Sequence, residues 1–253
     1  MLGSFFKNWF SNSGNVKADF SPLITDLHSH LIFGIDDGAG TAEDSIALAK
    51  ELVSLGFSKA ITTPHVISDS YKNNTEIILA GLEVLRKNLE IHNIGLKVEA
   101  SAEYYIDEAF EELVASSDLL SFGGEKRYVL FETSYVSKPL SLQTILFEMK
   151  MKGYMPVMAH PERYTFFWNA PFSEIEELYG CDIKFQINTS SFAGNNGERA
   201  NKIARKLLEA DMIDFLGTDL HRVRQAAPVR EAFMGDKNLR NLIQSGRLLN
   251  AHL

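Results

Sequence analysis

The stretch Asp26-Leu27-His28-Ser29-His30 follows a short apolar run, Pro22-Leu23-Ile24, and leads into the loop Gly34-Ile35-Asp36-Asp37-Gly38. The apolar run predicts a β-strand, and side chains two residues apart on a strand point to the same side. His28 and His30 therefore present two imidazole nitrogens in one direction, which is a way to hold one metal ion. Because His-x-His also occurs on ordinary exposed strands, the meaning of this stretch depends on the rest of the chain.

Short apolar segments alternate with helical segments from Leu23 onward. Runs rich in β-branched or aromatic residues predict seven strands, near residues 23–28, 58–63, 96–102, 127–132, 155–160, 183–188 and 213–217. Apolar residues at helical spacing predict helices over 41–56, 75–92, 141–152, 171–180, 197–210 and 228–235, and a final helix over 236–253. The first helix opens on a Thr41-x-x-Asp44 capping box and closes at Gly56. Successive βα units without a linker predict one closed α/β barrel rather than an open sheet.

The composition is that of a globular protein with a substantial core, since 45% of the 253 residues are apolar and 23% are charged. A formal net charge of −8 argues against nucleic-acid binding, which needs a basic face, but allows an anionic substrate held by local cations. Cys181 is the single cysteine, so no disulfide can form within the chain, and a cytoplasmic setting is expected. No apolar run approaches the roughly 18 residues of a membrane span.

Residues 1–21 are predicted to form an N-terminal arm, and residues 22–253 the barrel domain. The arm is aromatic, with Phe5, Phe6, Trp9 and Phe10 followed by a polar stretch. Its apolar part is too short and too interrupted for a signal peptide. Two interpretations stay open: the arm packs on the surface of its own domain, or it contacts a membrane surface or a partner protein.

Most histidines and several carboxylates follow directly after the predicted strands. They are His28, His30, Asp37, His65, Glu103, Glu132, His160, Asp219 and His221, with Asn188 at the end of the sixth strand. In a parallel barrel the carboxyl ends of the strands share one face, which is where active sites form. Each residue taken alone has an ordinary explanation, such as a helix cap or a turn. These ordinary explanations do not account for the convergence of all these residues on one face.

So many carboxylates and imidazoles on one face would repel and desolvate one another without bound cations. Mixed imidazole and carboxylate donors suit manganese, iron or zinc better than magnesium or calcium. The set exceeds what one ion needs, so we expect two or three divalent ions, with Glu132 as the natural bridge between them and Asp26 orienting a histidine. Other hydrolytic mechanisms lack their residues, because Cys181 is not followed by a phosphate-cradling loop that ends in arginine, and no Gly-x-Ser-x-Gly elbow is present.

At these positions the sequence resembles the polymerase and histidinol phosphatase (PHP) family of metal-dependent phosphoesterases. The matching segments, spread over about residues 23–222, are Asp26-Leu27-His28-Ser29-His30, Thr63-Pro64-His65, Glu132, His160-Pro161-Glu162-Arg163-Tyr164 and Thr218-Asp219-Leu220-His221. Within the family, the stretch from His28 to Gly38 and the segment His160-Pro161-Glu162-Arg163-Tyr164 are similar to the bacterial capsule and exopolysaccharide tyrosine-protein phosphatases. This resemblance implies a single distorted (β/α)7 TIM-like barrel with a trinuclear centre that often holds manganese.

The resemblance also implies roles for individual residues. It assigns metal ligation to His28, His30, Asp37, His65, Glu132, His160, Asp219 and His221, and phosphate binding to Arg163. A further arginine is expected soon after the last histidine, and Arg222 and Arg224 are both candidates. The implied substrate is phosphotyrosine in a protein, on the tail of a membrane-bound bacterial tyrosine kinase that controls capsular or exopolysaccharide synthesis. The oligomeric state stays open.

We expect a hydroxide activated by the metal ions to attack phosphorus in line, without a covalent phosphoenzyme. Arg163, with Arg222 or Arg224, would stabilise the developing charge, and Asp219 or His221 would pass a proton to the leaving group. Three alternatives remain: a phosphatase of a small monoester such as histidinol phosphate, a metal-dependent amidohydrolase, and a non-catalytic metal-binding docking module. The amidohydrolase is disfavoured because no strand end offers a lysine to bridge two metals.

Overall fold

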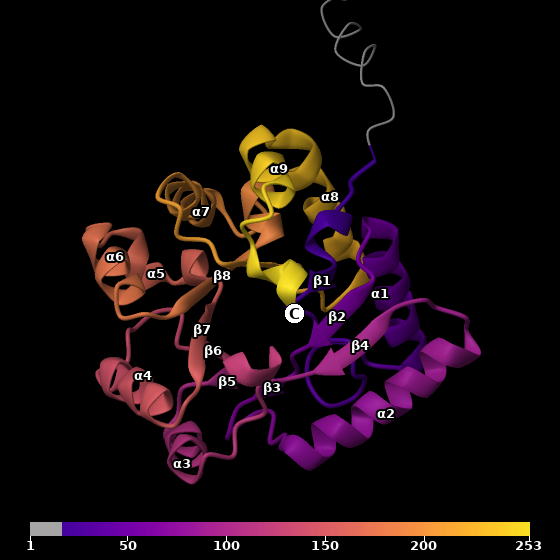
Figure 1. Ribbon diagram of the computed structural model, residues 1–253, viewed down its shortest axis with the longest axis horizontal. Coiled ribbons are helices and arrows are strands. Elements are labelled where there is room, and N and C mark those ends of the chain that lie inside the picture. Colours follow the sequence, from indigo (N-terminus) through magenta and orange to yellow (C-terminus); the bar gives the residue numbers. More distant parts are fainter. Residues whose placement is uncertain (1–16) are drawn as a thin grey trace, which may run out of the picture.

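Parallel strands form the wall of a barrel in the computed structural model, which describes residues 17–253. The strands are β1 (Thr25–Asp26), β2 (Lys59–Thr62), β3 (His65–Val66), β4 (Lys97–Ala100), β5 (Glu103–Tyr105), β6 (Tyr128–Glu132), β7 (Met155–Ala159), β8 (Lys184–Asn188) and β9 (Phe215–Gly217). Figure 1 shows them at the centre of a ring of helices. The parallel α/β architecture predicted from the sequence is therefore confirmed.

The wall of the barrel has strand positions, here called staves, and two of these staves are each built from two short consecutive strands. β2 continues as β3 after Thr63 and Pro64, and β4 continues as β5 after Ser101 and Ala102. One sheet has the order β1-β2-β4 and the other the order β3-β5-β6-β7-β8-β9. When each interrupted pair is counted once, the barrel has the seven predicted staves. The interruptions make it a distorted barrel, as expected.

The barrel closes between its first and last staves. Backbone hydrogen bonds run from His30 N to the Leu220 oxygen at 3.0 Å and from Asp219 N to the His28 oxygen at 2.7 Å. A buried side chain from the C-terminal segment joins the same two staves. Asn250 accepts a hydrogen bond from Leu216 N and donates to the oxygens of Thr25 and Leu216, at 3.0, 3.0 and 2.8 Å. The amide thereby pairs backbone groups that would otherwise be buried without partners.

The helices of the described chain lie outside the barrel. They are α1 (Ala42–Leu55), α2 (Thr75–Ile91), α3 (Glu108–Ser116), α4 (Leu142–Met151), α5 (Thr165–Trp168), α6 (Ser173–Tyr179), α7 (Glu198–Glu209), α8 (Ala226–Gly235) and α9 (Lys237–Gln244). Helix α1 has the predicted capping box, since Asp44 N donates to Thr41 Oγ1 at 3.2 Å and Thr41 N donates to the Asp44 carboxylate at 3.1 Å. It ends at Gly56, which has a φ of 103°.

The structure differs from the prediction at three helices, of which the four-residue α5 (Thr165–Trp168) is one that the sequence did not predict. Helix α3 has no counterpart among the predicted helices, although Asp107 caps it by accepting a hydrogen bond from Phe110 N at 2.9 Å. The single helix expected over 236–253 is wrong, because α9 stops at Gln244 and a short 3-10 helix follows at Leu249–His252. Gly246 interrupts the two with a φ of 71°, which an α-helix does not allow.

Apolar side chains fill the barrel at the end where the strands begin. Tyr128, Met155 and Phe215 are each the first residue of a strand, and they pack together with Leu249 and Leu253. Figure 1 places the C-terminus at the centre of the ring, so the C-terminal segment covers this end of the barrel. The opposite end, where the strands finish, is left for polar side chains.

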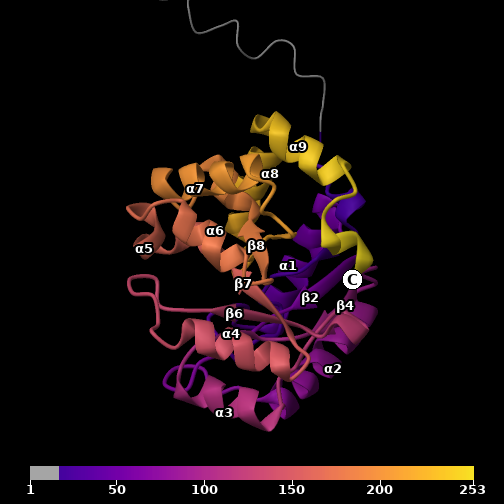
Figure 2. The same ribbon diagram turned by 60° about the vertical axis from the view of Figure 1, so that its left-hand side comes forward.

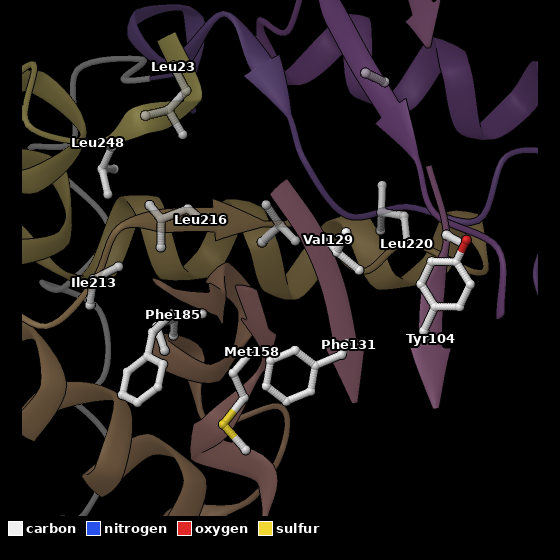
Figure 3. Close-up of a cluster of buried hydrophobic side chains, with 14 of the residues drawn as sticks. Leu23, Tyr104, Val129, Phe131, Met158, Phe185, Ile213, Leu216, Leu220 and Leu248 are labelled. Carbon is white, nitrogen blue, oxygen red and sulfur yellow. The ribbon is translucent and has the colours of Figure 1, made fainter. Parts of the chain in front are cut away.

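The outward side chains of the strands pack under the helices in a second, larger core. Figure 3 shows Phe131, Met158 and Phe185 from neighbouring strands gathered in this layer. In the turned view of Figure 2, α2, α3 and α4 lie on one side of the strands and α7, α8 and α9 on the other. The strands are thus held rigidly from outside, which fixes the residues at their ends.

Most of the predicted aromatic arm lies outside the described residues. Within its last part, Phe20 is fully buried, with ring centroids 5.5 Å from Phe57 and 5.0 Å from Phe233. This last part of the predicted arm therefore packs against the barrel domain. Among residues 17–253, no helix has the length and apolar character needed to cross a membrane.

Candidate metal centre

Nine acidic and imidazole side chains meet at the carboxyl end of the barrel. They are His28, His30, Asp37, His65, Glu103, Glu132, His160, Asp219 and His221, and they fall into four overlapping groups whose donor atoms lie within 4.8 Å of one another. All eight predicted ligands belong to the cluster. Glu103 belongs to it as well, although the ligand set implied by the resemblance omits it.

His28 and His30 converge as the His-x-His spacing predicts. Their Nε2 atoms are 3.3 Å apart, and both rings are fully buried. Two glycines make room for them. A Cβ on Gly38 would lie 2.4 Å from the His30 Cβ, and one on Gly217 would lie 2.6 Å from the His28 Cβ. The two imidazoles therefore pack directly on the backbone of neighbouring segments.

Glu103 lies at the centre of the cluster. Its carboxylate oxygens are 3.1 Å from His28 Nε2, 3.2 Å from His65 Nδ1 and 2.9 Å from His160 Nε2. The register between β3 and β5 pairs His65 directly with Glu103. Because Glu103 is also almost fully buried, its charge has no solvent to screen it and must be met by positive charge nearby.

The exposed Asp37 and the buried Glu132 complete the cluster. Asp37 Oδ1 lies 3.4 Å from His65 Nε2 and 3.3 Å from His221 Nε2. Glu132 Oε1 lies 3.2 Å from His65 Nδ1. Asp37 is thus part of the site rather than only a turn residue.

Two residues orient the first histidines through the ring nitrogen that faces away from the cluster. Gln186 Oε1 is 2.8 Å from His28 Nδ1, and Asp36 Oδ2 is 2.8 Å from His30 Nδ1. Both are acceptors, so each ring carries a proton on Nδ1 and directs its Nε2 atom into the cluster. Asp26 does not have the expected role of orienting a histidine.

Asp26 instead accepts hydrogen bonds from Thr218 N and Thr218 Oγ1, at 2.9 and 3.0 Å. The contact joins the first stave to the last just below the site. Burial raises the pKa of Asp26 to about 6, although the hydrogen bonds from Thr218 lower it. Asp26 therefore acts on the position of the segment that precedes Asp219.

Two strand ends reach the site through unusual backbone geometry. His160 has a φ of 35° and Asp219 a φ of 52°, both in the left-handed region. Such conformations cost about 1–3 kcal/mol each for residues other than glycine and occur mainly at functional sites. Here they turn the His160 and Asp219 side chains into the cluster at the point where β7 and β9 end.

The electrostatics of the cluster favour bound cations. Although burial opposes it, the carboxylates of Glu103 and Asp219 raise the pKa of His28 to about 10. Burial lowers the pKa of His30 to about 4, so its Nε2 lone pair is available at neutral pH. The buried carboxylates attract positive charge to the centre of the cluster. A neutral imidazole such as His30 can donate a nitrogen lone pair to a cation there, and divalent metal ions are bound by both kinds of group. The residues present therefore fit a metal centre.

The cluster forms the floor of an open pocket of about 580 Å³. Arg163 lines the pocket, and its Nη1 donates to Asp219 Oδ2 at 2.8 Å. Arg222 also lines it, but its Nη1 donates to backbone oxygens of Asp37, Gly38 and His221. Arg224 is exposed on the rim. Both candidates after His221 therefore line the pocket, and Arg222 in addition ties two loops together.

A family model described as capsular polysaccharide synthesis, CpsB/CapC, matches residues 24–234, which contain the whole cluster. The chain belongs to the CpsB/CapC family. It is 33% identical over 199 residues to tyrosine-protein phosphatase YwqE of Bacillus subtilis (strain 168), covering 79% of this chain and 78% of YwqE. It is 29% identical over 209 residues to tyrosine-protein phosphatase CpsB of Streptococcus pneumoniae, covering 80% and 85% of the two chains.

Comparison with solved structures also finds metal-dependent tyrosine phosphatases among the proteins that this chain resembles. The chain superimposes with a TM-score of 0.76 and 30% identity on a structure from work on YwqE of B. subtilis and CpsB of S. pneumoniae, described as metal-dependent tyrosine phosphatases. The match covers 90% of this chain and 94% of the other. An amidohydrolase from Mycoplasma synoviae aligns with a TM-score of 0.51 at 14% identity, over 90% and 83% of the two chains, and shares the fold alone.

Proposed function

We propose that this CpsB/CapC chain is a metal-dependent protein-tyrosine phosphatase. The observation that carries the proposal is the Glu103-centred cluster at the floor of an open pocket with Arg163 beside it. Divalent cations and an arginine are the groups that bind and polarise a phosphate monoester. The relatives named tyrosine-protein phosphatases support phosphotyrosine as the substrate.

The donor groups suggest how two or three ions would be held. The sets are His28, His30 and Glu103; His28, His160 and Asp219; His65, Glu103 and Glu132; and His30, Asp37, His65 and His221. Glu103 is the carboxylate that belongs to two of these sets, so it, rather than Glu132, would help to hold more than one ion. Mixed nitrogen and oxygen donors favour manganese, with iron or zinc as alternatives. When bound, such ions neutralise phosphate charge and lower the pKa of water toward 7.

Arg163 would bind the phosphate from the side of the pocket. Its guanidinium is anchored by Asp219 and lies 5.0 Å from the centroid of the Tyr135 ring. A guanidinium held on two sides loses little entropy when it binds two phosphate oxygens. Arg224 would add a second positive charge at the rim, while Arg222 keeps the loops of Asp37 and His221 together.

Proton transfer to the leaving group would fall to the Asp219 and His221 pair. His221 Nδ1 lies 3.4 Å from Asp219 Oδ1, and both line the pocket. A phenolate leaves readily, so a strong acid is less necessary than for an alkyl ester. This favours an aryl phosphate, such as phosphotyrosine, over a serine phosphate.

The biological substrate would be the phosphorylated tail of a bacterial tyrosine kinase in the cytoplasm. The family description, capsular polysaccharide synthesis, supports a role in the control of that export system. An open pocket also suits a phosphotyrosine that is part of a protein chain better than a small metabolite enclosed on all sides.

A chelation experiment tests the proposal. The protein is stripped of metal and assayed on a phosphotyrosine peptide, on histidinol phosphate and on p-nitrophenyl phosphate, before and after addition of Mn²⁺. We expect activity to disappear on stripping, to return with Mn²⁺ and to be greatest on the phosphopeptide. His30→Ala should abolish it, whereas His92→Ala, at an exposed position outside the cluster, should not.

The alternatives have distinct outcomes in the same assay. Preference for histidinol phosphate would identify a small-molecule phosphatase. No hydrolysis of any phosphate with full metal occupancy would favour a docking module. An amidohydrolase would cleave amides instead, and no lysine lines the pocket among the described residues.

A further inference from the structure

A second cavity, of about 470 Å³, lies next to the catalytic pocket. One wall is the segment from Val66 to Asn73, and the other is helix α3 with the residues just before it. Ile67 and Tyr71 line both this cavity and the catalytic pocket. The two spaces are therefore neighbours that share a wall, and nothing in the metal centre uses the second one.

The shared wall is a firmly built loop. Ile67 and Tyr71 exchange backbone hydrogen bonds, each of 3.0 Å. The Tyr71 ring stacks on His65 with centroids 5.6 Å apart and an interplanar angle of 15°. Asn73 Nδ2 donates to the His65 oxygen at 2.8 Å. The position of the wall is thus coupled to a residue of the metal cluster.

The opposite wall is fastened to the same loop. Asp107 caps helix α3 through Phe110 N and also accepts a hydrogen bond from Ser68 N at 3.0 Å. One carboxylate therefore holds the helix and the loop at a fixed separation. The cavity is preformed, which lowers the entropic cost of filling it.

The lining is mainly apolar. Ile67, Ala109 and Leu113 are half-buried, and Phe110 forms a fully buried floor. Lys72 and Glu112 are exposed at the edge and carry opposite charges, so the rim selects neither an acidic nor a basic ligand. Binding of an apolar side chain in this cavity would be favourable, because its surface would be removed from water and would contact the apolar lining.

We propose that this cavity binds an apolar side chain next to the phosphotyrosine in the protein substrate, and so selects the sequence around the scissile phosphate. The inference rests on the proposed function, because the phosphotyrosine must occupy the catalytic pocket. Because the two cavities share Ile67 and Tyr71 and an extended chain advances about 3.3 Å per residue, a residue close in sequence to the phosphotyrosine would reach the second cavity across this shared wall. The occupant is then a segment of the substrate rather than a separate ligand.

Two variants on the same helix test this inference. Ala109→Trp fills the cavity, whereas Ala115→Trp adds the same side chain at an exposed position of α3 that does not line it. Both are assayed with Mn²⁺ on p-nitrophenyl phosphate and on two phosphotyrosine peptides, one with leucine and one with glycine at the two positions on each side. Thermal melting checks that each variant is folded, and Leu113→Ser replaces Ala109→Trp if it is not.

We expect the wild type to prefer the leucine peptide, and Ala109→Trp to lower kcat/KM for that peptide about tenfold, mainly through KM, which corresponds to about 1.4 kcal/mol. Its activity on p-nitrophenyl phosphate should stay within about twofold of wild type, because the aryl phosphate alone does not reach the cavity. Ala115→Trp should match wild type on all three substrates.

Equal activity of the wild type on the two peptides would overturn the inference and leave the proposed phosphatase intact. So would a fall in Ala109→Trp that is the same for p-nitrophenyl phosphate as for the leucine peptide. If metal-loaded wild type hydrolysed neither peptide nor p-nitrophenyl phosphate, the proposed function itself would fail, and this inference with it.

Discussion

Glu103 is the residue on which the metal centre depends most, because its carboxylate contacts imidazoles from three strand ends. We expect Glu103→Gln to lose at least about 100-fold in kcat and to bind less metal, since an amide carries no charge to offset a divalent ion. Phosphatase assays and elemental analysis of the purified variant check this.

Glu99→Gln is the matched control, because Glu99 lies four residues earlier and pairs with Lys59 and Lys97 on the surface. It should keep wild-type activity and metal content. If Glu103→Gln kept both as well, the central position of this carboxylate would have no catalytic meaning.

Gln186 offers a second test at the residue scale. Its side-chain oxygen holds the His28 ring through Nδ1, so Gln186→Leu should weaken metal affinity about 10- to 100-fold. Gln186→Glu keeps an oxygen acceptor at this position and should retain most of the affinity. Titration of the stripped proteins with Mn²⁺ measures the difference, and equal affinities for the two variants would contradict the orienting role.

The sequence predicted eight metal ligands of the cluster and placed Glu103 on the same face, but it did not name Glu103 as a ligand and did not single out Gln186. His28, His65, His160 and His221 each stand in a recognisable segment after a strand, whereas a lone glutamate after a strand is commonly a helix cap. The central place of Glu103 follows from the β3–β5 register, which depends on where the second and third staves are interrupted. Pairing between distant strands of this kind is not visible in local sequence patterns.

At the scale of elements, helix α1 begins immediately after the loop that carries Asp36 and Asp37. Its capping box satisfies backbone groups at that junction. Thr41→Ala should therefore lower the free energy of unfolding by about 1 kcal/mol, whereas Thr41→Ser, which keeps the hydroxyl, should be close to wild type. Urea denaturation of the metal-free proteins measures both, and equal stability of the two variants would show that the cap contributes nothing.

Strongly periodic elements were predicted closely, and short ones were not. Helix α2 occupies Thr75–Ile91 against a predicted 75–92, because its apolar stripe continues over four turns. Strands β3 and β5 have two and three residues, too few for any alternation to be recognised. Helix α3 has nine residues, and its two buried positions, Phe110 and Val114, give little periodic signal. The C-terminal 3-10 helix is fixed by contacts with distant strands rather than by its own pattern.

For the whole molecule, the metal centre joins ligands from staves across the barrel, so metal should stabilise the fold as well as the reaction. A ligand at about 100 times its Kd stabilises the native state by about 2.7 kcal/mol. For a chain of this size, that corresponds to a change in Tm of about 5–10 °C. We therefore expect chelation to lower Tm by this amount in a calorimetric or dichroism melt.

The His30→Ala variant is the control for that melt, because it removes a ligand from two of the donor groups. Its Tm should respond less to Mn²⁺ and to chelator than that of the wild type. An unchanged wild-type Tm after complete metal removal would mean that the barrel is held by packing alone.

The closure of the barrel between its first and last strands, which the Asn250 side chain joins, has a consequence for the synthesis of the protein. The Asn250 amide bonds to Thr25, 225 residues earlier in the chain. At 5–20 residues per second, a ribosome needs roughly 10 to 45 s to travel between the two. Until β9 (Phe215–Gly217) has been made, the edge of β1 that will face it has no partner, and an unpaired strand edge invites association with other chains. The nascent chain therefore depends on protection of its first strand until the last part of the barrel has emerged.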